Sequence, residues 1–305
     1  MIDESFHIPV LTEEVIEFLL VKKNGTFLDV TSGFGGHSAA ILEELDGGSL
    51  IATDQDPEAV RFLNSKFITE ERISIHQARF SELHKLFSAN NFDGILADIG
   101  VSSYQLDTAE RGFSFMKDGP LDMRMNQNMG EDASSWLNHA SEQEISNIIW
   151  KYGEEKKAKR IAKAIVEARK NFKIRTTKEL AEIILEEVPR RFNDKKHPAT
   201  KTFQAIRIFI NNELEELDLL LDFTSKHLKI GGRTCIISFH SLEDRMVKRF
   251  FRDHSRRDPK LSKLPNLADD SSFNLVTKAI KPSEDEMNIN PRSRSATLRV
   301  IERIK

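Results

Sequence analysis

Cysteine is almost absent from this sequence, since Cys235 is the one cysteine among 305 residues. A single thiol excludes an internal disulfide and any metal site built from several cysteines. Cys235 lies in an apolar run at residues 234–237 that is typical of a buried strand. We therefore expect an inert thiol in the protein core and no bound metal.

Long hydrophobic runs are also missing, because none approaches the ~18 residues that a membrane-spanning helix needs. The first residues, MIDES, are acidic and lack the basic and apolar regions of a secretory signal peptide. Proline and glycine are sparse, with nine and fourteen residues, while 39% of the chain is hydrophobic and 30% is charged. This composition excludes disordered and fibrous proteins. We expect a cytoplasmic globular protein without a membrane partner.

An excess of one charge is absent as well, because 45 basic residues face 48 acidic ones, for a net charge of −3. Three segments are nevertheless strongly basic: residues 151–175 with net +7, 190–207 with net +5, and 245–263 with net +6. Solvated helix faces are the usual explanation of such runs. Three of them together favour a positive rim around one cleft, which suits a phosphate backbone and should weaken with salt.

The first hundred residues alternate short apolar runs with segments of helical character. One such helix covers residues 38–45, and another begins where Asp56 can cap it and Pro57 takes its first position. Strands separated by helices imply an α/β fold with a parallel sheet and right-handed crossovers. The strand-like runs in this part lie at residues 26–30, 49–53, 72–75 and 94–98.

The alternation stops after Asp98. Residues 104–130 have no clear period, and apolar stripes at helical spacing follow, at Ile161, Ala164, Ile165 and Ala168 and again at Leu180, Ile183 and Ile184. A further helix is expected near residues 203–230, and strand-like runs return at 233–239 and 295–301. A single core rarely grows beyond about 250–300 residues. We therefore predict a discontinuous sheet domain, residues 1–103 and 206–305, with a helical insertion at 104–205.

The sequence DVTSGFGGH at residues 29–37 joins the first predicted strand to a helix. Glycines there let a ligand approach the backbone, and Asp54, at the end of the second strand, is placed to bind ribose hydroxyls. Nicotinamide dinucleotides and S-adenosylmethionine both carry such a ribose. Ser38 replaces the third glycine of the dinucleotide fingerprint, and Asp29 precedes the glycines as in methyltransferases. These two details favour S-adenosylmethionine, with an ordinary tight turn as the alternative.

The sequence DIGVSSYQ at residues 98–105 follows the fourth predicted strand. Ligands of open parallel sheets bind beyond the carboxyl ends of the strands, so Asp98 should face both a cofactor and a substrate. Ser102 or Ser103 could instead cap a helix. Such a cap does not explain why an acidic residue ends an otherwise apolar strand.

The sequence ISFHSLEDR at residues 237–245 places His240 at the end of a neighbouring strand, where it should also face the cleft. The string from Ser241 to Asp244 alone predicts a capping box at the start of a helix. A buried neutral histidine bonded to a carboxylate is as compatible with this position as a catalytic one.

These motifs, together with several others, resemble the RsmH (MraW) family of 16S rRNA methyltransferases. The resemblance spans nearly the whole chain in order, which makes it far more specific than a glycine loop. Two positions depart from the family pattern, which often has glycine or alanine at Val30 and proline at Tyr104. The matching blocks are HIPVL (7–11), GGHS (35–38), DIGVSS (98–103), ERGFSF (110–115), DGPLDMRM (118–125), YGEE (152–155), HPATKTFQAIR (197–207), SFHSLEDR (238–245) and PRSRS (291–295).

The resemblance implies transfer of a methyl group from S-adenosylmethionine to the exocyclic N4 of cytosine 1402 of 16S rRNA, at the P site of the small (30S) subunit. It also implies a class I, Rossmann-like methyltransferase sheet with an inserted helical domain for substrate recognition. DNA is not expected as a partner, and a homodimer is possible. By position, the residues that hold the cofactor would be Gly35, Gly36, His37, Asp54, Phe80, Asp98 and Gln105.

The N4 lone pair of cytosine is delocalised into the ring, so a group that accepts an N4 proton would assist methyl transfer. Asp98 is the first candidate for this acceptor and His240 the second. An extruded base could stack on Tyr104, Phe113 or Phe115, and residues 118–125 are a candidate lid. Two other classes stay open: a nicotinamide-dependent oxidoreductase and a non-catalytic rRNA-binding assembly factor.

Overall fold

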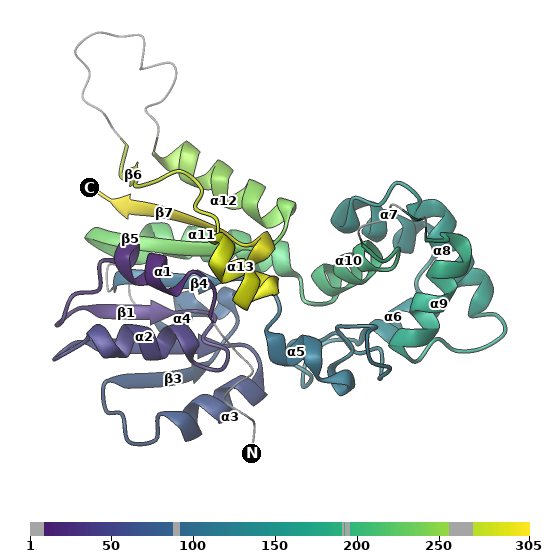
Figure 1. Ribbon diagram of the computed structural model, residues 1–305, viewed down its shortest axis with the longest axis horizontal. Helices are drawn as coiled ribbons and strands as arrows, with labels where there is room; N and C mark the ends of the chain where they lie inside the picture. The colour runs from purple at the N-terminus through teal and green to yellow at the C-terminus, as the bar shows by residue number, and fades with distance from the viewer. Residues whose placement is uncertain (1–8, 88–91, 191, 193–195, 256–270) are drawn as a thin grey trace, which may run out of the picture. The chain divides into compact units, whose positions relative to one another are not determined.

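The computed structural model describes residues 9–87, 92–190, 192, 196–255 and 271–305. The chain forms two compact units, which we call the sheet unit (Met1–Gly100 and Leu214–Lys305) and the helical unit (Val101–Glu213). Each is described by itself (Figure 1). The first two residues of the HIPVL block and parts of the basic segments 190–207 and 245–263 lie outside the described residues.

The sheet unit contains a seven-stranded sheet in the order β3-β2-β1-β4-β5-β7-β6. The first five strands are parallel, and β7 is antiparallel to both β5 and β6. The strand order reverses between β1 and β4, which makes their carboxyl ends the switch point where such sheets bind ligands. The strands are β1 (Thr26–Asp29), β2 (Ser49–Asp54), β3 (Ile73–Gln77), β4 (Phe92–Asp98), β5 (Leu228–Ser238), β6 (Phe273–Leu275) and β7 (Thr297–Arg303).

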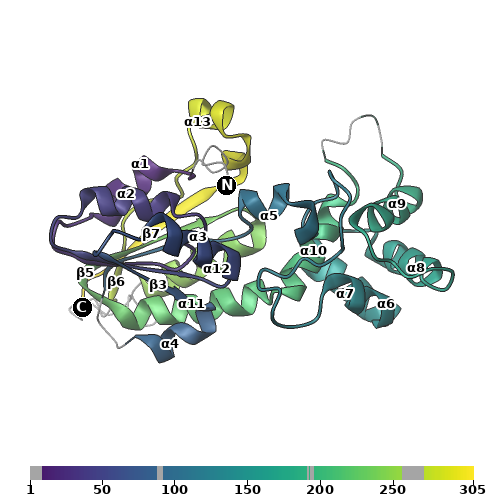
Figure 2. The ribbon, with the colours of Figure 1, turned by 90° about the horizontal axis from the view of Figure 1, so that it is seen from below.

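Helices cover both faces of the sheet because alternate side chains of each strand point to opposite sides. Phe27 and Leu96 pack in the core that includes α1 and α2, whereas Leu28 and Ile95 pack with α11 and α12 (Figure 2). The helices of this unit are α1 (Thr12–Leu19), α2 (Gly36–Glu44), α3 (Pro57–Lys66), α4 (Leu83–Leu86), α11 (Glu213–His227, whose first residue lies in the helical unit), α12 (Ser241–His254) and α13 (Glu284–Ile289), with short 3₁₀ turns η2 (Phe80–Glu82) and η4 (Pro291–Ser295).

The helical unit has an apolar core of its own, to which Trp136, Ile149, Ile161 and Phe203 contribute. Of the predicted stripes, Ile161, Ile165, Leu180, Ile183 and Ile184 are buried, while Ala164 and Ala168 are partly exposed. Its helices are α5 (Ser103–Asp107), α6 (Ala133–His139), α7 (Glu142–Gly153), α8 (Ala158–Ala168), α9 (Thr177–Glu187) and α10 (Thr200–Ile210), with a 3₁₀ turn η3 (Ala109–Arg111).

These elements confirm the predicted α/β Rossmann-like sheet and the helical insertion. Each strand-like run of the sequence corresponds to a strand, and Asp56 caps α3 by accepting the N–H of Glu58 at 2.9 Å. Cys235 is a free, fully buried thiol in β5, and burial raises its pKa, as expected for an inert core residue. Among the residues described, no helix combines the length and the apolar character needed to cross a membrane.

Two expectations about local structure were wrong. The single helix near residues 203–230 is in fact two, because the chain breaks at Asn211 and at Asn212, which has a positive φ of 52°. Gly231 also lies inside β5 rather than after a helix. The Asn211 side chain accepts the N–H of Met125 at 2.7 Å and donates to the carbonyl of Met123 at 2.8 Å, so the break holds residues of the helical core in place.

The predicted lid at residues 118–125 is instead part of the core of the helical unit. Leu121, Met123 and Met125 are buried there. The buried guanidinium of Arg111 donates to the carbonyls of Arg124 at 3.1 Å and Met125 at 2.8 Å. This segment is therefore fixed by its own unit and does not form a separately hinged loop.

Candidate active site

The glycine loop after β1 is joined directly to the end of β2. Gly33 and Gly35 have positive φ angles of 50° and 74°, a conformation that glycine adopts without steric cost. The N–H of Gly33 donates to Asp54 Oδ2 at 2.8 Å. A Cβ atom on Gly35 would lie 2.8 Å from side-chain atoms of Leu63 and Phe67, so only glycine fits there. The loop is thus held open by backbone geometry at the switch point.

Asp54 holds two backbone groups with its two oxygens. While Oδ2 accepts from Gly33, Oδ1 accepts the N–H of Asp56 at 2.8 Å. Burial, reinforced by the neighbouring charge of Asp56, raises the pKa of Asp54 to about 7. Asp54 therefore orders both the glycine loop and the start of α3, in addition to the ribose contact predicted for it.

Asp29, at the end of β1, is only 1% exposed and is fully engaged within the protein. Its Oδ2 accepts the hydroxyl proton of Ser38 at 2.7 Å, and its Oδ1 accepts the N–H of Thr31 at 3.2 Å. Burial raises the pKa of Asp29 to about 6. The carboxylate thus ties the loop to α2, and its oxygens are turned toward these protein groups.

Asp98, at the end of β4, is bonded differently. Its N–H donates to Thr31 Oγ1 at 2.6 Å, but its buried Oδ1 has no hydrogen-bond partner among the described residues. Burial, together with the charges of Asp29 and Glu243, raises the pKa of Asp98 well above its usual range. A buried acceptor without a donor costs about 1–3 kcal/mol, so its retention at the switch point indicates a site for a ligand that donates a hydrogen bond.

His37 on α2 lies beside Asp98 with a defined tautomer. Its Nε2 is 2.9 Å from the carbonyl oxygen of Val10, and a carbonyl only accepts, so Nε2 carries a proton. In the neutral ring, Nδ1 is then the nitrogen with a lone pair, and it lies 3.8 Å from Asp98 Oδ2. His37, predicted as a cofactor residue, is 6% exposed and borders the Asp98 carboxylate.

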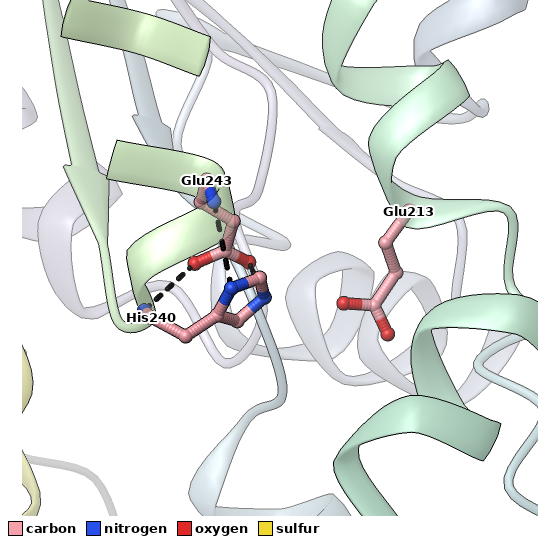
Figure 3. A group of neighbouring side chains, drawn as sticks. All are labelled: Glu213, His240 and Glu243. Atoms are coloured by element: carbon pink, nitrogen blue, oxygen red, sulfur yellow. Dashed lines mark hydrogen bonds and ion pairs between the residues drawn. The ribbon is translucent and has the colours of Figure 1, made fainter. Parts of the chain in front are cut away.

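His240 caps helix α12 in a reciprocal arrangement with Glu243 (Figure 3). Glu243 Oε2 accepts the N–H groups of Phe239 at 2.9 Å and His240 at 3.2 Å, and the N–H of Glu243 donates to His240 Nδ1 at 3.4 Å. His240 Nε2 is 3.0 Å from Glu243 Oε1, without the alignment of a hydrogen bond. The capping box therefore starts one residue before the predicted Ser241.

The structural alternative for His240, a buried histidine beside a carboxylate, is what the structure shows. Its role as second candidate proton acceptor stays a prediction. Glu213, which Figure 3 also labels, belongs to the helical unit, where it forms an ion pair with Arg207 at 2.7 Å.

The last two predicted cofactor residues differ in their surroundings. Phe80 begins η2 just after β3 and is partly exposed, near the end of β2, where Ala78 donates to the carbonyl of Asp54 at 3.0 Å. Gln105 belongs to the helical unit, where its Oε1 accepts the N–H of Ser102 at 3.1 Å while Ser102 Oγ accepts the N–H of Gln105 at 3.2 Å. The predicted N-cap role of Ser102 is thus confirmed.

The sheet unit accordingly brings most of the predicted site residues to the carboxyl ends of neighbouring strands. Sequence reasoning did not single out Thr31, which bridges Asp29 and Asp98, or Glu243, which holds His240. Both lie inside quoted motifs, but a hydroxyl or a carboxylate in a motif does not reveal its partner without the fold. The predicted cofactor residues that the sheet unit contains are Gly35, Gly36, His37, Asp54, Phe80 and Asp98.

A mainly parallel sheet with a glycine loop and acidic residues at its switch point defines a Rossmann-like protein with a nucleotide-type cofactor site. Among solved structures, the chain is similar at 10% identity and a TM-score of 0.44 to an S-adenosylmethionine-dependent methyltransferase from Aquifex aeolicus, with 99% of this chain and 94% of that one covered.

Sequence comparison is more specific. The model of the MraW methylase family matches residues 4–304. Ribosomal RNA small subunit methyltransferase H from Coxiella burnetii (strain Dugway 5J108-111) is 49% identical over 305 residues, covering 98% of this chain and 99% of that protein. The protein of the same name from Xanthomonas oryzae pv. oryzae (strain PXO99A) is 47% identical over 301 residues, covering 98% and 89%. The chain belongs to the MraW methylase family.

Proposed function

We propose that this protein is an rRNA methyltransferase that uses S-adenosylmethionine to methylate the exocyclic N4 of cytosine 1402 of 16S rRNA in the small ribosomal subunit. Membership of the methylase family and the names of its relatives support the class of reaction. The observation that carries the chemistry is the buried, unsatisfied Oδ1 of Asp98 at the switch point.

The residues present fit such a cofactor. The open glycine loop at Gly33 and Gly35 offers a close backbone approach, and Asp54 and Phe80 lie at the ends of the next two strands. We assign them to the ribose and the adenine, respectively, since an aromatic face packs well on a base. When bound, S-adenosylmethionine supplies a methyl group that its sulfonium already activates.

The chain's own contribution is to position the base, exclude water and hold a proton. Asp98 Oδ1 accepts a hydrogen bond from the N4 amino group, which localises the lone pair on N4, and it takes the proton that methylation makes acidic. A raised pKa makes the Asp98 carboxylate a stronger base than an ordinary aspartate. His37 Nδ1, at 3.8 Å, helps to orient this carboxylate.

We assign methyl transfer to the sheet unit and recognition of the assembled small subunit to the helical unit. The helical unit contains the most basic segment of the chain, residues 151–175. On α8, Lys159 and Lys163 are exposed while Ile161 and Ile165 are buried, and neither lysine forms an ion pair with any residue that the structure describes. Such a face is complementary to phosphates.

The test is methyl transfer from S-[methyl-³H]adenosylmethionine to 30S subunits that lack the modification, followed by nucleoside analysis. We expect label in N4-methylcytidine, and none when 16S rRNA carries uridine at position 1402. Label in another nucleoside would overturn the N4 assignment. Salt-sensitive binding without any transfer would identify a non-catalytic assembly factor, and substrate-dependent oxidation of a nicotinamide cofactor would identify an oxidoreductase.

A further inference from the structure

Helix α12 presents four basic side chains on one exposed face. Arg245, Lys248, Arg249 and Arg252 are all exposed and follow the i, i+3, i+4, i+7 spacing that aligns side chains along one side of a helix. Within α12, Asp253 is the one exposed acid, paired with Arg252 at 2.7 Å and with Arg249 at 3.7 Å. The face therefore keeps a net positive charge.

The remaining acids of α12 do not neutralise this face. Glu243 is buried, where it holds the backbone at the start of the helix. Asp244 is paired with Arg299 of β7 at 2.8 Å. The opposite side of the helix is anchored by Val247 and Phe251, which are buried in the core of the sheet unit. The cationic face is thus held outward on a rigid support.

Helix α11, which packs into the same core, has the opposite character. Its exposed residues include Glu215 and Asp218, and its lysine near the carboxyl end, Lys226, is paired with Asp222 at 2.7 Å. A polyanion approaching this side of the sheet unit is therefore repelled by α11 and attracted by α12.

The position of α12 links its charge to the proposed reaction centre. The helix starts right after His240, at the carboxyl end of β5, and Ile237 of β5 is paired with Asp98 of β4. With a rise of about 1.5 Å per residue, the four cations lie roughly 6 to 17 Å along the helix from its first residue. A strand whose target base reaches Asp98 can therefore lay its neighbouring phosphates along this face.

We propose that the face formed by Arg245, Lys248, Arg249 and Arg252, here called the α12 cationic face, binds phosphates of the RNA next to the target nucleotide. This inference rests on the proposed function and assigns part of substrate binding to the sheet unit itself. RNA is favoured over a membrane because α12 exposes no large hydrophobic side chain that could enter a lipid interface.

The experiment compares the double variant Lys248→Gln/Arg249→Gln with a matched control, Lys23→Gln/Lys85→Gln. Lys23 and Lys85 are exposed on the same unit, the former before β1, at the opposite edge of the sheet from Asp98. For the α12 variant we expect the KM for 30S subunits to rise about tenfold while kcat stays within twofold. S-adenosylmethionine affinity and melting temperature should match the control.

A salt titration supplies a readout that does not depend on catalysis. Each lost phosphate contact on a single strand reduces the slope of log affinity against log salt concentration by about 0.7, so the α12 variant should lose roughly 1.4. A KM and a salt slope equal to those of the control would overturn the inference. Loss of binding to phosphatidylserine vesicles with unchanged binding to 30S subunits would do the same and would indicate a membrane partner.

The two proposals fail in different ways. If the wild-type protein transfers no methyl group to 30S subunits, the proposed function has failed, whereas the salt-dependent binding of the α12 variant still tests this surface. If wild type methylates cytosine 1402 and the α12 variant does so with the control's KM, the surface assignment alone is wrong.

Discussion

The ends of β1 and β4 carry the same residue type in two different states. Asp29 is 1% exposed, and each of its oxygens accepts a hydrogen bond, from Ser38 and from Thr31. The Asp98 side chain is 14% exposed and leaves its buried Oδ1 without a donor among the described residues. The two strands are neighbours in the sheet, so this difference arises from the loops that follow them and not from the strands themselves.

The comparison separates a structural carboxylate from one available for chemistry. Thr31 connects the two, because its N–H donates to Asp29 and its hydroxyl accepts from the Asp98 N–H at 2.6 Å. The satisfied group fixes the loop, and the fixed loop holds the unsatisfied one in position. Four experiments can break or sharpen this division, and the largest effect is expected at Asp98.

Replacing Asp98 with asparagine should lower the rate of methyl transfer by a factor of about 10² to 10⁴, the range typical for loss of a general base. The amide keeps the shape of the side chain but cannot take a proton. Thermal stability should be equal or higher, since a buried charge is removed. Single-turnover transfer to 30S subunits and calorimetry check both parts, and a wild-type rate would remove Asp98 from the acceptor role.

Stability should show the reverse order. Asp29→Ala leaves the Ser38 hydroxyl and the Thr31 N–H without their partner, at about 1–3 kcal/mol for each buried group. Asp98→Ala removes an oxygen that has no partner to lose, and should cost less than about 1 kcal/mol. Urea denaturation measures both values. Equal losses for the two alanine variants would contradict the division between the carboxylates.

The pH dependence of stability offers a third comparison. Burial raises the pKa of Asp29 from 3.8 to about 6, so the folded state binds a proton more tightly than the unfolded state. The resulting stabilisation is complete below about pH 4 and is lost as pH rises through 6, by at most about 3 kcal/mol at 1.36 kcal/mol per unit. Asp54, with a pKa raised to about 7, extends the decline.

Asp29→Asn should remove the part of this decline between pH 4 and pH 6. Denaturant titrations of both proteins at half-unit pH intervals measure the difference. A free energy of unfolding that falls equally steeply in the variant would show that Asp29 is not the group responsible.

The smallest effect is expected for Glu243→Gln. Glutamine can still accept the N–H groups of Phe239 and His240, so the start of α12 should remain intact. The charge of Glu243 is one of the causes that raise the pKa of Asp98, after burial and the charge of Asp29. The acidic limb of the pH–rate profile should therefore move to lower pH by less than one unit, and a shift to higher pH would refute the coupling.

The sequence predicted the parts of this site that depend on local pattern. Apolar runs that end in Asp29, Asp54 and Asp98 placed these carboxylates at the carboxyl ends of strands. The glycine pattern predicted the loop, and Gly33 and Gly35 adopt the positive φ angles that require glycine. Such features are set by residues close together in the chain.

What the sequence could not predict depends on partners distant in the chain or on register. No pattern distinguishes a buried Asp29 from an exposed one, because Ser38 reaches it only when α2 packs on the sheet. The strings from His240 and from Ser241 both permit a cap, and the turn decides between them. The break at Asn212 between α10 and α11 was missed because neither proline nor glycine marks it.

The single thiol gives the sheet a built-in reporter of its own opening. Cys235 is completely buried in β5, hydrogen-bonded between β4 and β7, and burial raises its thiol pKa. A thiol reagent can reach it only when these central strands separate, so the rate of alkylation follows the most stable cooperative unit and not the loops around the site. One residue thus allows the opening of this sheet to be timed without introducing a label.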